Sequence, residues 1–425
     1  MAESRHVAVL GAGMHPWGKW GRSFVTYGLT AARAALDDAG LGWTDIELVS
    51  GADTIRNGYP GFVSGATFAQ ALGWSGCRVA SSYAACASGA AAIANARAHI
   101  LAGLVDVALV VGADTTPKGF FAPIGGERRD DPDWLRFHLL GATNPTYFAL
   151  YARRRMALHS TTEQDLAAVK VKNSRHGAAN PYARYRKAVS IEEVLASPMV
   201  ADPLRLMEIC ATSDGGAALV LSSMDFARRH LEKLGGGHGA GSTHRSQSRP
   251  LAKIAAVSTV TPRYPSTVIE MPHFATDSAV TPIPRTAENR PDLPDHATEF
   301  RASIARAAYE EAGVAPEDVD IAEVYDLSSA LELDWYEDIG LCEKGEAEHL
   351  LRSGYTAIGG RVPVNPSGGL SSFGEAIPAQ AIAQVCEIVW QLRGEAAGRQ
   401  VEGARVGVSA NQGLFGHGSS VLLIR

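Results

Sequence analysis

A cysteine at the start of a small-residue helix is the first group in this sequence that could do chemistry. Cys86 lies in the run Ser82–Ala90 (SYAACASGA), and an alanine-rich stretch follows it. The first turn of a helix carries the positive end of the helix dipole, which favours a thiolate over a thiol. Small neighbours leave room for a substrate to reach the sulfur. Cys86 is therefore a candidate nucleophile, although most free cysteines are simply small buried side chains.

Three other side chains with acid–base or hydrogen-bonding chemistry lie in the second half of the chain. Glu375 follows a glycine-rich loop, residues 365–374 (NPSGGLSSFG), and Tyr325 ends an apolar strand where a helix begins. His417 lies in a glycine-rich turn between the last two expected strands. A glycine-rich loop lets the backbone approach a ligand closely, a tyrosine can carry a proton, and a histidine beside backbone N–H groups can polarise a carbonyl. The alternatives are a carboxylate that stabilises its helix, a buried core tyrosine and a turn histidine.

Composition and charge exclude several classes of function. The chain has 425 residues, enough for two or three domains, and it is 46% hydrophobic and 20% charged, as folded proteins are. Its net charge of −6 offers no basic excess for a nucleic-acid backbone, and no apolar stretch is long enough for a membrane span. The amino-terminal residues lack a signal-peptide pattern, so a cytoplasmic protein is expected. The five cysteines show neither metal-ligand nor disulfide spacing, and with no nucleotide-binding motif we expect no resident metal or cofactor.

An internal repeat indicates how these residues are positioned. Residues 32–40 (ARAALDDAG) and 305–313 (ARAAYEEAG) are similar, and each leads into a short acidic turn and an apolar strand. The offset is constant, because 305 − 32 and 318 − 45 are both 273. A helix closed by a glycine, then a turn and a strand, is therefore present twice. Chance similarity of two alanine-rich helices is the alternative, but duplication of one α/β unit explains the gapless match better.

Alternating strands and helices predict a sheet covered by helices on both faces. The expected elements are a helix at 88–102 and strands at 7–11, 105–112, 406–410 and 420–424. Residues 115–203, rich in Arg, Tyr, His and Pro, interrupt the pattern and predict an inserted excursion with helices at 147–158 and 163–174. Residues 235–249 (GGGHGAGSTHRSQSR) predict a flexible linker between the halves 1–234 and 250–425.

Several motifs in order resemble the thiolase superfamily, and within it the sterol-carrier-protein-X-type thiolases and the bacterial lipid-transfer-protein homologues. The matching segments are, in chain order, Ala85–Gly89, His176–Pro181, Ser197–Pro203, Thr212–Ala218, Glu323–Ser328, Asn365–Leu370 and the last glycine-rich hairpin. The resemblance covers nearly the whole chain. It implies an α/β fold, a five-layer α/β/α/β/α sandwich built from two duplicated halves, with a loop domain inserted in the first half at about 115–203.

The sequence departs from the thiolase pattern at three catalytic positions, while Cys86 keeps the position of the nucleophile. Glu375 replaces the histidine that activates the cysteine, and Tyr325 replaces the histidine of a His-Asp-Cys-Phe segment. The second catalytic cysteine is replaced by Gln412, or by Asn411 if the alignment shifts by one. A carboxylate beside the sulfur disfavours the thiolate. These changes remove the activator of the cysteine and the group that moves the α-proton of the acyl chain.

The losses favour a resemblance to the steroid side-chain aldolases, which cleave a β-hydroxyacyl-CoA by retro-aldol chemistry and form no acyl-enzyme. We then expect Tyr325 to take the proton of the β-hydroxyl and Glu375 to relay that proton or to tune the phenol. His417 and its hairpin would stabilise the enolate, with Cys86 as a wall of the pocket. Two alternatives stay open: acyl transfer through Cys86 with Glu375 as base, and a non-catalytic acyl-CoA- or lipid-binding subunit of a partner enzyme.

The resemblance also implies partners and a substrate. Thiolases are at least homodimers, and the aldolase-type relatives bind an OB-fold, zinc-ribbon protein that can link them to an enoyl-CoA hydratase. The substrate is an acyl-CoA, but a steroid, a branched lipid and an acetyl unit would leave similar marks on these motifs. Arg184, Arg186 and Lys187, in the expected loop domain, are candidates for binding the CoA phosphates. A solvated basic patch is the commoner explanation for such a group.

Overall fold

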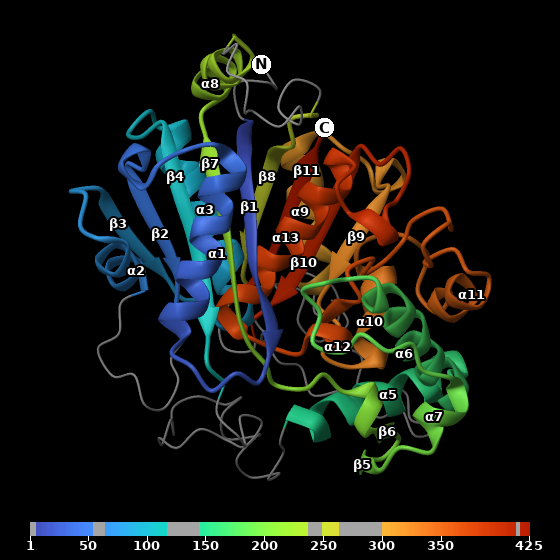
Figure 1. Ribbon diagram of the computed structural model, residues 1–425. Coiled ribbons are helices and arrows are strands. Elements are labelled where there is room, and N and C mark those ends of the chain that lie inside the picture. Colours follow the sequence, from blue (N-terminus) through green and yellow to red (C-terminus); the bar gives the residue numbers. More distant parts are fainter. Residues whose placement is uncertain (1–5, 54–63, 117–143, 237–248, 263–299, 414–416) are drawn as a thin grey trace, which may run out of the picture.

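The computed structural model describes residues 6–53, 64–116, 144–236, 249–262, 300–413 and 417–425. In these residues a nine-stranded mixed sheet has helices packed on both of its faces (Figure 1). The strand order is β3-β2-β4-β7-β1-β8-β11-β10-β9. The strands are β1 (Val7–Gly18), β2 (Leu48–Ala52), β3 (Arg78–Ser82), β4 (Val107–Asp114), β7 (Asp214–Ser222), β8 (Lys253–Val260), β9 (Ile321–Val324), β10 (Val406–Gln412) and β11 (Gly418–Ile424).

The sheet consists of two halves that meet at β1 and β8. Its first five strands come from the first half of the chain and its last four from the second half. β1 and β8 pair antiparallel at Val7 with Ile254 and at Ala8 with Lys253. Every residue of β4 is buried, which explains its continuous apolar sequence, because helices cover both faces of that strand. The strands expected at the end of the chain are β10 and β11, an antiparallel pair.

The repeated unit of the sequence occurs twice in the fold. Helix α1 (Phe24–Ala39) leads through a 3-10 turn to β2, and α9 (Phe300–Ala312) leads in the same way to β9. The two strands begin 273 residues apart, as 321 − 48 shows, so the offset of the sequence repeat is kept. Gly40 and Gly313 follow the two helices with the same φ of 66°, a left-handed conformation that glycine adopts without a steric penalty.

Two buried helices form the middle layer of the molecule. α3 (Ser88–Leu101) packs against α13 (Ile377–Arg393), and both contact strands from the two halves of the sheet. Every residue of α13 is buried. Small residues permit this close packing: a Cβ at Gly112 of β4 would lie 2.2 Å from the carbonyl oxygen of Pro378. The amino-terminal ends of both middle-layer helices are therefore held in fixed positions.

Further helices cover the outer faces of the sheet. α1 and α2 (Ser64–Leu72) pack on strands of the first half, and α9 packs on β8, β11 and β10. The order of layers is therefore outer helices, one half of the sheet, the middle-layer helices, the other half of the sheet and outer helices, which confirms the predicted α/β/α/β/α sandwich. The other elements outside the excursion are α8 (Met224–Gly236), α10 (Ser329–Asp338), α11 (Ala347–Arg352), α12 (Gly369–Phe373) and the 3-10 turns η2 (Trp43–Asp45), η3 (Ala85–Ala87), η5 (Pro316–Asp318) and η6 (Ala397–Arg399).

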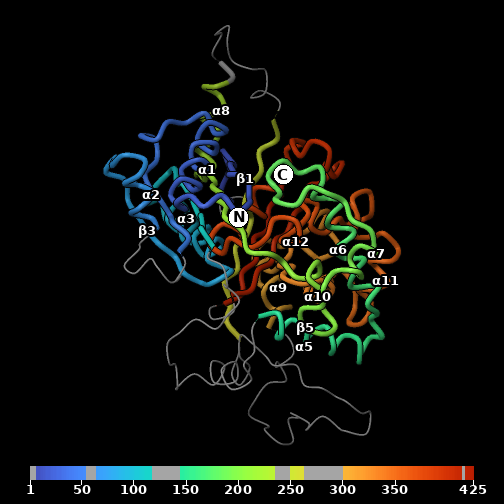
Figure 2. Tube along the Cα trace, turned by 60° about the horizontal axis from the view of Figure 1, so that its bottom comes forward, coloured from blue at the N-terminus to red at the C-terminus, as the bar shows by residue number. Residues whose placement is uncertain are grey.

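The excursion expected at 115–203 is described except for residues 117–143. It holds α5 (Asn144–His159), α6 (Glu163–Ala178), α7 (Ile191–Leu195) and β5 (Met199–Ala201), and the hairpin partner β6 (Leu204–Arg205) and the turn η4 (Leu206–Glu208) follow directly after it. Its helices lie on the same side of the molecule as α10, α11 and α12 (Figure 2). Buried Arg155 of α5 fastens it there, with ion pairs to Asp334 and Glu337 at 2.7 Å and to Glu348 at 2.9 Å.

Most of the linker expected at 235–249 lies outside the described residues. Gly235 and Gly236 are the last residues of α8, and Arg249 forms ion pairs with Asp38 at 2.8 Å and with Glu395 at 3.0 Å. No helix in the described ranges is long and apolar enough to cross a membrane. Within the same ranges, no group of three or more His, Cys, Asp or Glu side chains is arranged to hold a metal ion.

Candidate active site

The amino-terminal ends of the two middle-layer helices bring Cys86 and Glu375 together. Cys86 lies in the turn η3, directly before α3, and Glu375 lies two residues before α13. The Cys86 thiol donates a hydrogen bond to Oε1 of Glu375 at 3.1 Å. Both side chains are buried, at 3% and 1% exposed. These residues are 289 positions apart in the sequence, and the packing of α3 on α13 makes them neighbours.

Ser88 holds the backbone turn that carries the cysteine. Its hydroxyl donates to the carbonyl oxygen of Ala85 at 2.6 Å and accepts the N–H of Ala84 at 2.9 Å. Ala85 has a φ of 48°, a left-handed conformation that is uncommon for a residue with a side chain. Gln380 of α13 donates from its amide to the carbonyl oxygen of Cys86 at 3.2 Å. An uncommon backbone conformation that hydrogen bonds from neighbouring side chains stabilise on both sides is typical of a functional site.

The loop that carries Glu375 is fastened to the segment before β7. The N–H of Glu375 donates to the carbonyl oxygen of Ala211 at 2.6 Å, and the N–H of Ser213 donates to that of Glu375 at 2.9 Å. Gly374 has a φ of 77°, and a Cβ there would lie 2.3 Å from the Ser213 hydroxyl oxygen. Glycine is therefore required beside the carboxylate, which these backbone contacts hold toward the thiol.

Tyr325 lies in the same buried cluster of side chains as Cys86, immediately after β9. It is 2% exposed, and its hydroxyl faces Cys86 and makes no hydrogen bond of good geometry with a described residue. Burial raises the pKa of the phenol well above its usual value of 10, and the charges of Cys86 and Glu375 raise it further. The phenol is thus neutral at physiological pH. It can take a proton from a substrate hydroxyl only while it passes its own proton on, and the nearby Glu375 carboxylate is a candidate acceptor.

Asp326 fastens the glycine-rich loop beside the tyrosine. Its carboxylate accepts the backbone N–H groups of Leu370 at 2.7 Å and of Ser371 at 3.1 Å. A Cβ at Gly369 would lie 2.4 Å from the same carboxylate, so only glycine allows this approach. Because Asp326 follows Tyr325 directly in the chain, it ties the tyrosine to the loop that leads to Glu375.

His176, in the motif His176–Pro181, supports the start of that loop. Its Nδ1–H donates to the carbonyl oxygen of Asn365 at 3.0 Å, and its Nε2 accepts the N–H of Ile358 at 3.1 Å. Burial, helped by the charge of Lys172, lowers the pKa of His176 to about 3. The imidazole is therefore neutral, and its role is to hold two backbone segments together.

The last hairpin contacts the turn before α3. A Cβ at Gly413 would lie 2.0 Å from the carbonyl oxygen of Ala84, so the end of β10 lies directly against that turn. The Nε2 atom of His417 is buried and has no partner among the described residues, and burial lowers the pKa of this imidazole. Asn411 is buried and donates to the side chain of Gln384 at 2.6 Å. His417 is thus a neutral group in the expected hairpin, while residues 414–416 lie outside the described residues.

The structure adds Cys210, which the sequence did not single out as a site residue. Cys210 is 3% exposed and belongs to the same cluster of buried side chains as Cys86 and Tyr325. Its pKa is raised by burial first and then by the charge of Glu375. The signal available in the sequence was its position two residues before the motif Thr212–Ala218.

The three side chains expected to bind CoA occupy different surroundings. Arg184 is half-buried, donates to the carbonyl oxygen of Thr212, and lies 4.7 Å from the centre of the Tyr185 ring. Arg186 and Lys187 are exposed to solvent. Of the three, Arg184 contacts Thr212, and the backbone of Thr212 pairs with that of Glu375.

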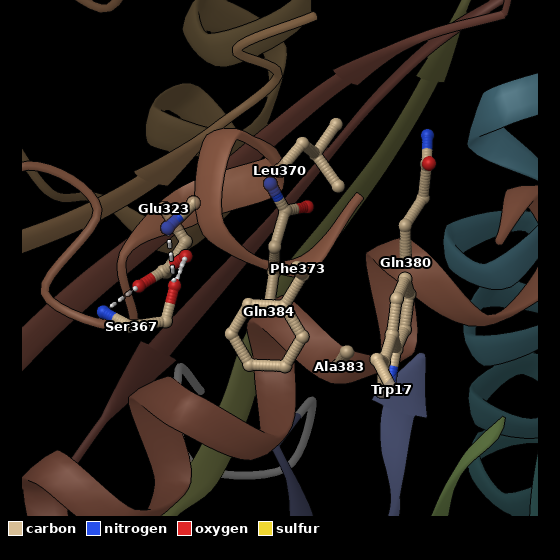
Figure 3. A pocket seen from close by; sticks show the side chains of 9 residues that line it. Trp17, Glu323, Ser367, Leu370, Phe373, Gln380, Ala383 and Gln384 are labelled. Atoms are coloured by element: carbon tan, nitrogen blue, oxygen red, sulfur yellow. Dashed lines mark hydrogen bonds between the residues drawn. The ribbon is translucent and has the colours of Figure 1, made fainter. Parts of the chain in front are cut away.

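A small cavity lies next to Gln380, whose amide holds the carbonyl of Cys86. Its lining residues are Trp17, Glu323, Ser367, Gly369, Leu370, Phe373, Gln380, Ala383 and Gln384. Figure 3 shows Glu323 and Ser367, joined by hydrogen bonds of 2.7 and 3.0 Å, on one side, and Gln380 with Trp17 on the other. Oε1 of Gln380 and Nε1 of Trp17 have no partner among the described residues. The cavity offers about 20 Å³ for the centre of a water molecule, which is room for one.

Comparison with known proteins identifies the family of this chain. The family model described as thiolase, N-terminal domain, matches residues 7–225, and the model described as thiolase C-terminal domain-like matches residues 285–425. The chain belongs to the thiolase family. An acetyl-CoA acetyltransferase of Methanothermobacter thermautotrophicus is 32% identical to it over 430 residues, which cover 98% of each chain.

A second relative of this thiolase-family chain indicates the branch. Sterol carrier protein 2 of Bos taurus is 30% identical, and the match covers 96% of this chain and 70% of that protein. Among solved structures, the Ltp2-ChsH2(DUF35) aldolase has a TM-score of 0.76 at 24% identity, covering 99% of this chain and 98% of that one, which shows the shared fold. The chain is thus an acyl-CoA-processing, thiolase-type enzyme of the sterol-carrier-protein-type branch, which favours the enzyme interpretations over a non-catalytic binding subunit.

Proposed function

We propose that this thiolase-family enzyme cleaves a β-hydroxyacyl-CoA by a retro-aldol reaction and forms no acyl-enzyme. The observation that carries the proposal is the buried hydroxyl of Tyr325, which faces Cys86, lies near Glu375 and makes no hydrogen bond of good geometry with a described residue. A buried hydroxyl without a partner costs free energy, so a ligand group that pairs with it binds favourably. The β-hydroxyl of the substrate is such a group.

The reaction breaks the bond between the α- and β-carbons of the acyl chain. The β-hydroxyl gives its proton to Tyr325, its oxygen becomes the carbonyl oxygen of the released ketone, and the electrons of the broken bond form the enolate of the acyl-CoA. Since burial keeps Tyr325 a neutral phenol, it passes its own proton to Glu375 in the same step. A proton returned to the α-carbon completes the reaction, which needs no oxidant, reductant or second substrate.

The surroundings of Cys86 support a reaction that does not use a thiolate. Its thiol donates to a carboxylate, where the thiolase pattern has an imidazole that would accept the proton and become positively charged. A thiolate next to the Glu375 carboxylate would place two negative charges side by side in a buried site, which is unfavourable. In the proposed reaction, Cys86 forms the wall of the pocket beside Tyr325.

The substrate we propose is a CoA thioester with a steroid or branched-lipid acyl chain. The names of the two similar proteins support this class, since one is a sterol carrier protein and the other an aldolase. Arg184 is our candidate for binding a CoA phosphate, because it is half-buried beside the site, whereas Arg186 and Lys187 are exposed and Lys187 forms an ion pair with Glu193 at 2.8 Å.

The deciding experiment compares Tyr325→Phe with Cys86→Ala. Each variant is incubated with a steroid β-hydroxyacyl-CoA, the released ketone is quantified, and the intact protein is weighed to detect a bound acyl group. We expect Tyr325→Phe to lower ketone release by at least about 100-fold, as loss of a proton carrier does, and Cys86→Ala to keep most of the activity. An inactive Cys86→Ala variant together with an acylated wild-type enzyme would overturn the proposal.

Acyl transfer through Cys86 is a second candidate, favoured by one specific contact. The 3.1 Å hydrogen bond from the thiol to Glu375 also gives the thiol proton a base, which is the arrangement that activates a nucleophile. For this reaction we expect acetyl-CoA to add one acetyl group to the wild-type protein. Glu375→Gln and Cys86→Ala would both prevent that addition, as measured by intact-protein mass spectrometry.

We also propose that the enzyme is a homodimer that binds an OB-fold, zinc-ribbon partner, which in turn can link it to an enoyl-CoA hydratase. β3 is an edge strand of the sheet (Figure 1), Val79 in it is 45% exposed, and Tyr83, the residue after it, is 43% exposed. An exposed edge strand presents unpaired backbone groups, which favours pairing with a second chain. The name of the structural neighbour, Ltp2-ChsH2(DUF35) aldolase, includes a second protein. This supports a partner protein for the present chain. Light scattering of the wild type and of Val79→Lys measures the oligomeric state and so tests the homodimer. Affinity purification from the native host tests whether a partner protein binds.

A further inference from the structure

We propose that Cys210 is a second catalytic thiol of this site and exchanges a proton with the α-carbon of the acyl-CoA. The inference rests on the proposed function, because retro-aldol cleavage leaves an enolate that needs an acid. The ligand it predicts is the enolate of a CoA thioester, held between the Tyr325 hydroxyl and the Cys210 sulfur.

Backbone pairing places Cys210 between the two loops that carry the site. On one side, its N–H donates to the carbonyl oxygen of Leu327 at 2.9 Å, two residues after Tyr325. On the other side, the next residue, Ala211, accepts the N–H of Glu375 at 2.6 Å. Isolated β-bridges on both sides of Cys210 continue this pairing. The thiol is therefore positioned by an extended segment that is fixed to both loops.

The Cys210 thiol is buried but is not used as a structural hydrogen-bond donor. Among the described residues, no hydrogen bond involves its sulfur, whereas the equally buried Cys386 donates to the carbonyl oxygens of Gly13 and Ala218 at 3.8 and 3.5 Å. The hydroxyl of Tyr325, in the same cluster as Cys210, makes no hydrogen bond of good geometry there either, and the side chain that faces it is Cys86. Two proton-carrying groups that no well-formed hydrogen bond occupies in one buried cluster point to a ligand that contacts both.

The charges around Cys210 keep the proton on the sulfur until a strong base arrives. Burial raises the pKa of the thiol, and the charges of Glu375 and Asp326 raise it further. At neutral pH the group is thus a thiol, the form that a general acid needs. The charge of Lys170 acts in the opposite direction, and burial lowers the pKa of this lysine to about 8. A protonated Lys170 would stabilise the thiolate that remains after the proton transfer.

The proposed step balances atoms and charge. The S–H bond of Cys210 breaks and a C–H bond forms at the α-carbon, which converts the enolate into the product acyl-CoA. The thiolate then regains the proton that Tyr325 and Glu375 took from the β-hydroxyl, and the site returns to its starting state. The thiolase pattern has its second thiol in the last hairpin, where this chain has Gln412, so Cys210 supplies a thiol from a different segment.

The test separates proton exchange at the α-carbon from carbon–carbon cleavage. Acetyl-CoA and propionyl-CoA are incubated with the enzyme in deuterium oxide, and mass spectrometry follows deuterium at the α-carbon. Ketone release from a β-hydroxyacyl-CoA is measured separately. We expect Cys210→Ala to slow the exchange at least about 100-fold and Tyr325→Phe to lose cleavage but keep exchange. Cys386→Ser, a change at a buried cysteine outside the site, should keep both.

Every outcome bears on the inference or on the proposed function. If Cys210→Ala exchanges and cleaves at the wild-type rate, the inference is overturned and the retro-aldol function stands. If the wild type exchanges the α-proton through Cys210 but releases no ketone, the proposed function fails and the role of Cys210 remains. A wild-type enzyme that exchanges neither probe also overturns the inference. Circular dichroism checks the fold, and Cys210→Ser carries the comparison if Cys210→Ala does not fold.

Discussion

Replacing His176 by glutamine should remove a specific part of the acid sensitivity of this fold. His176 is 5% exposed, donates to the carbonyl oxygen of Asn365, and accepts the N–H of Ile358. Protonation would put a second N–H on the ring and leave the Ile358 N–H facing a donor instead of an acceptor. A glutamine amide has both a donor and an acceptor, so it can keep the two contacts without titrating.

The size of the effect follows from the pKa of His176, which is about 3 in the folded chain against 6.5 for an ordinary histidine. Below pH 6.5 the unfolded chain binds a proton that the folded chain does not, so stability falls as the pH falls. Each pH unit between 6.5 and 3 costs about 1.4 kcal/mol. From pH 7.5 to pH 5 the loss from this one residue is therefore about 2 kcal/mol.

Urea unfolding at pH 7.5, 6.5, 5.5 and 5.0 measures this loss for the wild type and for His176→Gln. The free-energy difference between the two proteins should change by about 2 kcal/mol over this range, in favour of the variant at low pH. Glu208, whose pKa is raised to about 7, changes stability in the opposite direction but is present in both proteins. The exposed His349→Gln serves as control. A difference that does not change with pH would refute the reasoning.

Three further predictions concern the scaffold of the site. Gly413→Ala should lower the activity by about an order of magnitude and also lower the melting temperature, because its Cβ would lie 2.0 Å from the carbonyl oxygen of Ala84 and push the hairpin away from the turn before α3; steady-state kinetics and a thermal melt check this. Arg155→Leu should lower the free energy of unfolding by about 3–5 kcal/mol, because three buried carboxylates lose an ion pair, although Asp334 keeps Arg301 and Glu337 keeps Lys344; urea unfolding measures it, and an unchanged midpoint would contradict it. A high-resolution crystal structure should show one ordered water in this cavity, bonded to Nε1 of Trp17 or to Oε1 of Gln380, and a dry cavity would show that both atoms stay unpaired.

The local elements and the repeat could be predicted from the sequence because they depend on neighbours along the chain. Helical periodicity, a closing glycine and an apolar run lie within a few residues of each other, so the two copies of the helix–turn–strand unit were visible with their offset of 273 residues. The start of the alanine-rich helix located Cys86 for the same reason. The order of the motifs indicated the thiolase family and the layered fold that the structure confirms.

The composition of the site was decided by the tertiary structure. Cys86 and Glu375 are 289 residues apart, and only the packing of α3 on α13 brings the thiol to 3.1 Å from the carboxylate. Cys210 is recognised as a site residue only in the structure, because backbone pairing places its segment between two loops that are far apart in the sequence. No local sequence pattern predicts that pairing. Tyr325 is expected to accept a proton, and burial makes it a neutral phenol that must pass its own proton on as it does so. Contact distance and desolvation, which set this chemistry, exist only once the chain has folded.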